Sequence, residues 1–107
     1  MKENPLIKVS DIDRPDVWFD LRVTCLSLLD SPSPSICQKG YVADESGAIQ
    51  FVLWQKSSKT GVPELKSGKS YILQNVVSNE YRGQFSIALV KSTKVQEIED
   101  LGLQEEF

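Results

Sequence analysis

Hydrophobic and polar side chains alternate along residues 48–54, AIQFVLW, as they do in a half-buried β-strand. Ile49, Phe51 and Leu53 fall on one face, which we expect to line a core. Trp54 falls on the other face, at its end. A large aromatic on the face that should meet water indicates either a cap on the core or a contact site for a ligand.

The same period of two predicts further strands over residues 17–25, 37–43, 70–77 and 84–90. In the first of these, Val17, Phe19, Leu21, Val23 and Cys25 alternate with polar residues and Trp18. We therefore expect a long first strand that is able to bend and pair with two neighbours.

Turn residues separate these strands. Residues 44–47, DESG, predict a tight turn in which Gly47 takes a positive φ and Asp44 accepts backbone N–H groups. Residues 78–83, SNEYRG, predict a hairpin loop, and residues 30–35, DSPSPS, predict an extended loop.

Helix is expected in one place only, between the third and fourth strands. Residues 56–68 contain Gly61, Pro63 and Gly68, so any helix there is short, and Leu65 is placed to close one end of a core. This layout predicts an all-β fold: a five-stranded OB-fold Greek-key barrel with a short helix or turn between strands three and four. An SH3-like barrel also has five strands, but its main insertion lies elsewhere.

The 107 residues are enough for one domain and one core. We expect an N-terminal lead-in over residues 1–15, the barrel over 16–95 and an acidic tail over 96–107. No apolar run is long enough to cross a bilayer, and the first residues, MKENPLIK, lack the apolar region of a signal peptide. The expected location is therefore the cytoplasm.

Charge is distributed unevenly around a net value of −3. Residues 1–20 carry three basic and five acidic side chains, residues 21–95 carry nine basic and five acidic ones, and residues 96–107 carry five acidic ones alone. The predicted barrel is therefore mildly basic, which permits binding to nucleic acid without requiring it.

The composition argues against an enzyme. The chain has no histidine, which excludes His-based triads and most catalytic zinc sites. Cys25 and Cys37 cannot complete a metal site by themselves, and in a cytosolic chain we expect both to be reduced. Asp44 and Glu45 are adjacent in a turn, where we expect a structural role. We therefore expect no catalytic activity, no metal and no cofactor.

Three motifs occur in order: VADESGAIQFVLW at 42–54, LKSGKSY at 65–71 and NVVSNEYRGQFSI at 75–87. Over residues 6–98 the chain resembles the single-domain OB-fold single-stranded-DNA-binding proteins of archaea and their relatives among replication protein A domains. Each motif is weak alone, and the ordered set is fairly specific.

The resemblance implies roles for individual residues. In that family the aromatics that match Trp54 and Tyr81 stack on unpaired bases, and a basic residue placed like Arg22 contacts the DNA strand. A further aromatic expected late in the fourth strand corresponds to Val77, which puts a full ladder of stacked bases in doubt. Trp18 either supplies the aromatic that is missing at Val77 or packs under the N-terminal lead-in.

The residues themselves suggest further contacts. Lys39, Lys56, Arg82 and Lys91 come from four segments that a barrel would bring around strands two, three and five, and Gln50 and Gln84 can hydrogen-bond on the same face. Trp18 and Phe51 are weaker candidates for stacking. Each residue also has a structural alternative. Trp54 caps the core, and Tyr81 has only a structural role in its hairpin turn. Arg22 pairs with a surface acid, and the lysines only aid solubility.

We therefore expect binding of single-stranded DNA with little sequence preference, in replication, recombination or repair, because free bases offer π-faces that a duplex hides. Two alternatives stay open. One is an RNA-binding OB domain. The other is an OB domain that serves protein interaction or assembly in a complex like replication protein A, as the acidic tail and Val77 would fit. The tail at 96–107 either recruits partner proteins, competes with nucleic acid for the basic face, or packs on the barrel.

Overall fold

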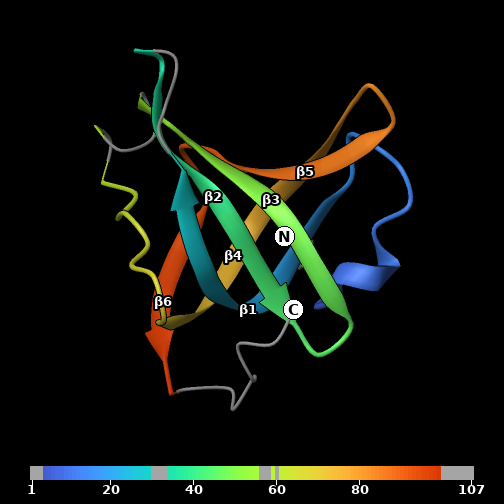
Figure 1. Cartoon of the computed structure of the whole chain (residues 1–107), viewed down its shortest axis with the longest axis horizontal. Helices are drawn as coiled ribbons and strands as arrows, with labels where there is room; N and C mark the ends of the chain where they lie inside the picture. Colours follow the sequence, from blue (N-terminus) through green and yellow to red (C-terminus); the bar gives the residue numbers. More distant parts are fainter. Residues whose placement is uncertain (1–3, 30–33, 56–58, 60, 100–107) are drawn as a thin grey trace.

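The computed structural model describes residues 4–29, 34–55, 59 and 61–99. Within them the chain forms a short 3-10 helix, η1, and six strands (Figure 1). Their bounds are η1 Val9–Asp11, β1 Trp18–Leu29, β2 Ile36–Asp44, β3 Gly47–Trp54, β4 Ser70–Tyr81, β5 Gln84–Leu89 and β6 Lys94–Ile98.

Five strands close into a barrel in the order β1-β2-β3-β5-β4, and pairing between β4 and β1 completes the circle. All neighbours are antiparallel except β3 and β5, which run parallel. β1 bends so that Thr24 pairs with Ala43 of β2 on one edge and with Ser70 of β4 on the other. The all-β, five-stranded OB-fold barrel predicted from the sequence is confirmed, with β6 as an extra strand along β4.

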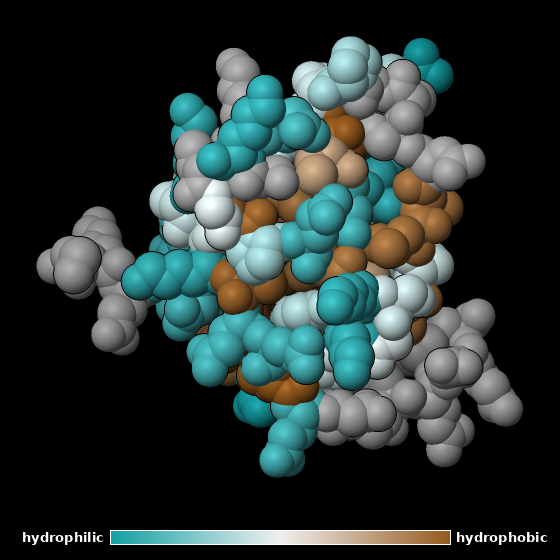
Figure 2. Space-filling model, turned by 90° about the vertical axis from the view of Figure 1, so that its left-hand side faces the viewer, coloured by the Kyte–Doolittle hydropathy of each residue, from teal (hydrophilic) through white to brown (hydrophobic). Residues whose placement is uncertain are grey.

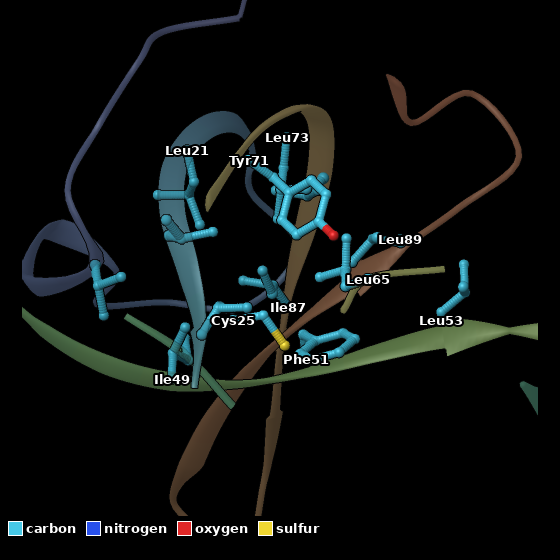
Figure 3. Packing of buried hydrophobic residues seen from close by; sticks show 14 of the residues in the cluster. Leu21, Cys25, Ile49, Phe51, Leu53, Leu65, Tyr71, Leu73, Ile87 and Leu89 are labelled. Carbon is cyan, nitrogen blue, oxygen red and sulfur yellow. The ribbon is translucent and has the colours of Figure 1, made fainter. Parts of the chain in front are cut away.

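The inward side chains of the strands form one core (Figure 3). Leu21 and Cys25 of β1, together with Phe51 of β3, Leu73 of β4 and Ile87 of β5, point toward a common centre and are all fully buried. The predicted inward face of β3 is therefore confirmed. Phe51 is 0% exposed, so the suggestion that it stacks on bases was wrong: it belongs to the core.

Leu65 closes one end of this core, as its sequence position predicted, with 1% of its side chain exposed. The amide of Gln38 holds it in place. Gln38 accepts a hydrogen bond from the Leu65 N–H at 2.8 Å and donates one to the Leu65 carbonyl at 2.6 Å. The segment between β3 and β4 is thereby tied to β2.

The N-terminal segment packs along the barrel at the right of Figure 1. Leu6 pairs with Asp20 of β1, and Val9 is buried in the core. Asp44 fixes η1 by accepting the Val9 N–H at 2.9 Å, and it accepts the Ser46 N–H of its own turn at 2.7 Å. Asp44 is thus a structural carboxylate, as the turn motif indicated.

Three expectations need adjustment. β4 continues to Tyr81, so the predicted loop at 78–83 shrinks to a two-residue turn at Arg82 and Gly83. β6, which the sequence did not predict, crosses the boundary expected between residues 95 and 96. The helix or turn expected over residues 56–68 lies partly outside the described residues; of its described positions Lys59 is helical, whereas residues 61–68 form turns and irregular backbone.

Candidate nucleic-acid interface

Strand register defines one outward surface of the barrel, which we call the open face. Directly paired residues point to the same side of a sheet, so the pairings can be followed from strand to strand. One row consists of Lys39 (β2), Val52 (β3), Ala88 (β5), Val77 (β4) and Trp18 (β1). The next consists of Tyr41, Gln50, Ser86 and Asn79 on the first four of these strands.

Two ends complete the open face. Trp54 lies two residues beyond Val52 on the same side of β3, opposite Ile36 of β2. At the other end, Tyr81 of β4 pairs with Gln84 of β5. The open face therefore extends from Trp54, across the two rows, to the β4–β5 hairpin.

Trp54 is 39% exposed. Alternation along β3 puts it outside, because Leu53 before it is fully buried in the core. The indole therefore has one part against the barrel and another part open to a flat ligand.

Tyr81 is the most exposed large hydrophobic side chain among the described residues, at 71%. It ends β4 and stands next to a turn in which Arg82 has φ 52° and Gly83 has φ 79°. The Arg82 guanidinium lies 5.2 Å from the centre of the Tyr81 ring. A phenol ring and a cation are thus presented together at the tip of the hairpin.

Trp18 lies directly opposite Val77. It is 44% exposed, so the N-terminal lead-in does not cover it. The aromatic surface that the family resemblance placed at Val77 is therefore available from the neighbouring strand. At the centre of this row Val77 is half-buried and its partner Ala88 is buried, with 2% exposed.

Tyr41 was missed in the sequence analysis. It is 40% exposed and lies on the open face beside Gln50. Its neighbours Gly40 and Val42 are both buried, so alternation along β2 could have revealed it. It brings the exposed aromatics of the open face to four: Trp18, Tyr41, Trp54 and Tyr81.

The predicted cations lie at different places around these aromatics. Lys39 is half-buried in the first row. Lys91 follows the end of β5, whose last residue, Leu89, pairs with Leu53 beside Trp54. Arg82 lies at the opposite end, and Lys56 lies outside the described residues.

Arg22 is exposed on β1, two outward positions beyond Trp18. Its neighbour on β4 is Ile72, which in turn pairs with Gln96 of β6. It therefore lies toward the β1–β4–β6 side and not among the rows of the open face.

None of these cations is neutralised within the described part of the chain. The ion pairs found there join Lys8 to Glu45 at 2.7 Å and Arg14 to Asp13 at 3.3 Å. Lys39, Arg82, Lys91 and Arg22 have no carboxylate within 4.0 Å in that part. Asp20, the acid two residues before Arg22 on β1, accepts the N–H of Asn75 at 2.8 Å.

The described residues offer no metal site and no membrane-spanning helix. No three of their cysteine, aspartate and glutamate side chains are grouped so that they could hold a metal ion. None of the helices in the described ranges is long and apolar enough to cross a membrane. Both cysteines are free thiols, Cys25 buried and Cys37 half-buried.

No protein-family model matches this chain, and neither does any curated protein sequence. Solved structures do match. The solution structure of the OB domain, residues 67–166, of MM0293 from Methanosarcina mazei is 30% identical in sequence and superposes with a TM-score of 0.83. The match covers 96% of this chain and 94% of that domain.

More distant structures share the fold. Pot1pC of Schizosaccharomyces pombe, solved with the single-stranded DNA CGGTTACGGT, has 11% identity and a TM-score of 0.69, over 92% of this chain and 90% of that one. A murine DNA-binding protein, solved with double-stranded DNA, has 12% identity and a TM-score of 0.63. That match covers 91% of this chain and 49% of the murine one. At such identities the likeness concerns the fold alone.

The likeness to MM0293 is closer, because it combines sequence identity with nearly complete coverage of both chains. It agrees with the OB-fold barrel described above. The chain belongs to the OB-fold domain family that the OB domain of MM0293 represents.

Proposed function

We propose that this domain binds single-stranded nucleic acid, with DNA as its main ligand and little overall sequence preference. One observation carries the proposal: four exposed aromatic side chains and several cations without acidic partners occupy the open face. A stacked base contributes about 1–3 kcal/mol on such an aromatic, whatever its identity. The cations would neutralise phosphates between the stacked bases.

The two rows of the open face define a path for the bound nucleic-acid strand. Trp54 and Tyr81 stack on bases at the two ends, and Trp18 and Tyr41 extend the stacking surface between them. Lys39, Lys91 and Arg82 meet phosphates along this path, Gln50 and Gln84 hydrogen-bond to bases, and Arg22 reaches only a strand that continues over β1. An open face that offers four exposed aromatics suits the lower end of the roughly 4–16 nucleotides that one OB fold covers.

The related structures support this proposal in a general way. OB domains of known structure have been solved with single-stranded DNA, as in Pot1pC, and with duplex DNA, as in the murine protein. An exposed aromatic favours the single strand, since duplex bases are already stacked on each other. We place the domain, as a non-enzymatic protein of the archaeal or replication protein A type, in the cytoplasm at unpaired chromosomal DNA.

Intrinsic fluorescence tests the proposal directly, because Trp54 and Trp18 are both on the open face. We expect quenching by oligo-dT, weaker quenching by a duplex, and a reduced response in Trp54→Phe and in Trp18→Phe. Equal quenching by oligo-rU would favour the RNA-binding alternative, because stacking does not distinguish the two sugars. No response to any of the three ligands at micromolar protein would contradict binding to nucleic acid.

A protein-interaction role has one observation in its favour. Leu28 and Leu29, at the end of β1, are each 43% exposed. Figure 2 shows the side of the molecule that carries β6, where hydrophobic patches reach the surface between hydrophilic residues. If Trp54→Ala keeps nucleic-acid affinity while Leu28→Ser with Leu29→Ser abolishes self-association in sedimentation, the assembly role gains over the binding role.

A further inference from the structure

A cavity opens at the hairpin end of the open face. Its volume is about 380 Å³, within the lower part of the range of small-molecule sites. Tyr41 and Gln50 contribute to it from the second row, and Gln84 and Phe85 contribute from the start of β5. Val9 and Ile12, at either end of η1, line it from the N-terminal segment.

The cavity combines apolar walls with two uncommitted amides. The side-chain amides of Gln50 and Gln84 make no hydrogen bond within the described residues, although their backbones pair with neighbouring strands. Gln38 provides the contrast, since both ends of its amide are occupied by the backbone of Leu65. The side-chain amides of Gln50 and Gln84 are therefore available for a ligand, whereas that of Gln38 is structural.

The occupant has to meet two requirements. It needs an apolar, flat body to lie against Tyr41 and the half-buried Phe85, and it needs a polar edge with a donor and an acceptor side by side. A nucleobase has both. A glutamine amide offers one donor and one acceptor in the same spacing, which is why it can pair with a base edge through two hydrogen bonds.

We propose that this cavity holds one base of the bound strand, read by the amides of Gln50 and Gln84. The inference rests on the proposed function and refines it: stacking elsewhere tolerates any base, while this position discriminates among bases. A strand that passes from Trp54 toward Tyr81 reaches the cavity directly, because Gln50 lies in the second row and Gln84 pairs with Tyr81.

The test uses the shortest oligo-dT that binds the full chain. Each position in turn is replaced by A, C or G, and affinities are measured by fluorescence anisotropy. We expect one position at which affinities differ at least about fivefold, the lower end of what a bidentate contact to a base contributes. At the other positions the differences should stay within about twofold.

Substitutions assign this preference to the cavity. Gln50→Leu combined with Gln84→Leu should reduce the difference to within about twofold. Oligo-dT should then bind more weakly, by the contacts of the two amides, but still measurably through stacking on Trp54 and Tyr81. Both positions face outward, so the fold should survive, and a thermal melt checks this. Gln96→Leu, an exposed glutamine on β6, is the matched control and should keep the full preference.

The outcomes separate the two proposals. Binding without any selective position, or a preference that persists in the double variant, would overturn the base-reading cavity and leave the stacking interface intact. Absence of binding to every oligonucleotide would overturn the proposed function, and the cavity proposal with it.

Discussion

At the scale of single residues, the most informative position is Arg82. Its φ of 52° lies in the left-handed region, which costs a side-chain-bearing residue about 1–2 kcal/mol. With Gly83 at φ 79° it forms a hairpin turn with two positive φ values, for which Asn-Gly is the favoured sequence. An arginine kept at such a position suggests that its charge serves binding and not stability.

Replacing Arg82 by asparagine should therefore have opposite effects on stability and binding. We expect Arg82→Asn to raise the free energy of unfolding by about 0.5–1 kcal/mol, since asparagine tolerates this backbone conformation. Binding to oligo-dT should weaken, and the slope of log affinity against log salt should fall by about 0.7, as for one lost phosphate contact. Urea unfolding and anisotropy titrations measure the two effects.

Lys94→Asn is the control for this change, because it removes the same charge from β6, away from the open face. It should leave the salt slope unchanged. If Arg82→Asn lowers stability, or leaves affinity and slope as they are, the functional explanation of the strained turn is wrong.

Cys25 gives the fold a dependence on alkaline pH. Burial raises the pKa of its thiol from 9.0 to about 11, and a backbone hydrogen bond at Ser27 offsets a smaller part of this rise. Between these values the unfolded chain releases the proton and the folded chain keeps it. The folded-state advantage is therefore complete below pH 9 and is lost as pH rises toward 11.

We expect the free energy of unfolding to fall by about 2–3 kcal/mol over this interval on account of Cys25, from 1.36 kcal/mol per pKa unit. Burial also raises the pKa of Tyr71, which adds a decline in the same direction. Denaturant unfolding across this pH range should show a shallower decline in Cys25→Ala than in the native chain. Cys37→Ala, at a half-exposed thiol, should retain the full decline.

At the scale of secondary-structure elements, the contact between β1 and β2 leaves no room for a side chain at Gly40. A Cβ there would lie 2.2 Å from the Ser27 carbonyl oxygen and 3.1 Å from the Leu28 Cα. These are backbone atoms, so they cannot move aside as a flexible side chain would. The register of β1 shifts between Cys25 and Ser27, which brings its backbone over β2 at this point.

Gly40→Ala should therefore destabilise the barrel by about 1–3 kcal/mol, the usual range for overpacking, or more if β1 has to shift its register. Thermal and urea unfolding provide the measurement. Gly61→Ala is the comparison, since a Cβ there meets nothing within 4 Å and only its φ of 109° opposes the change. A loss well below about 1 kcal/mol in Gly40→Ala would show that the close approach of β1 contributes nothing.

Alternation along the strands was sufficient to predict five of the six strands, the inward face of β3 and the outward position of Trp54. It could not predict β6, because KVQEI is short, mostly polar and continuous with an acidic segment. It also could not show that Trp18 lies opposite Val77, since register between distant strands depends on how β1 bends. The cavity between η1 and β5 was likewise beyond it, because segments far apart in sequence form it.

At the scale of the whole molecule, the distribution of charge does not follow from the closed barrel. The net charge is −3, although the cations of the open face have no acidic partners within the described residues. Residues 100–107 contain three acidic residues, Asp100, Glu105 and Glu106, and no basic one. We hypothesise that these acids compete with nucleic acid for the open face.

The end of β6 determines how this can be tested. Deleting residues from 97 onward would remove the end of β6, which pairs with β4 through Glu97 and Ile98. Ending the chain after Glu99 leaves β6 whole and changes the net charge from −3 to 0. A full-length variant with Asp100→Asn, Glu105→Gln and Glu106→Gln has the same net charge and keeps the length of the chain.

For the native chain, about three neutralised phosphates predict a slope of log affinity against log salt near −2, at roughly 0.7 per phosphate for single strands. Both charge-reduced variants should bind oligo-dT more tightly than the native chain at about 50 mM salt, because attraction to the open face is then opposed by fewer acids. The difference should vanish near 1 M salt, where the Debye length falls to about 3 Å. Anisotropy titrations across this range measure both quantities. Equal affinities at low salt would refute the competition, whereas a gain in the truncated chain alone would attribute the effect to the segment's bulk and not to its charge.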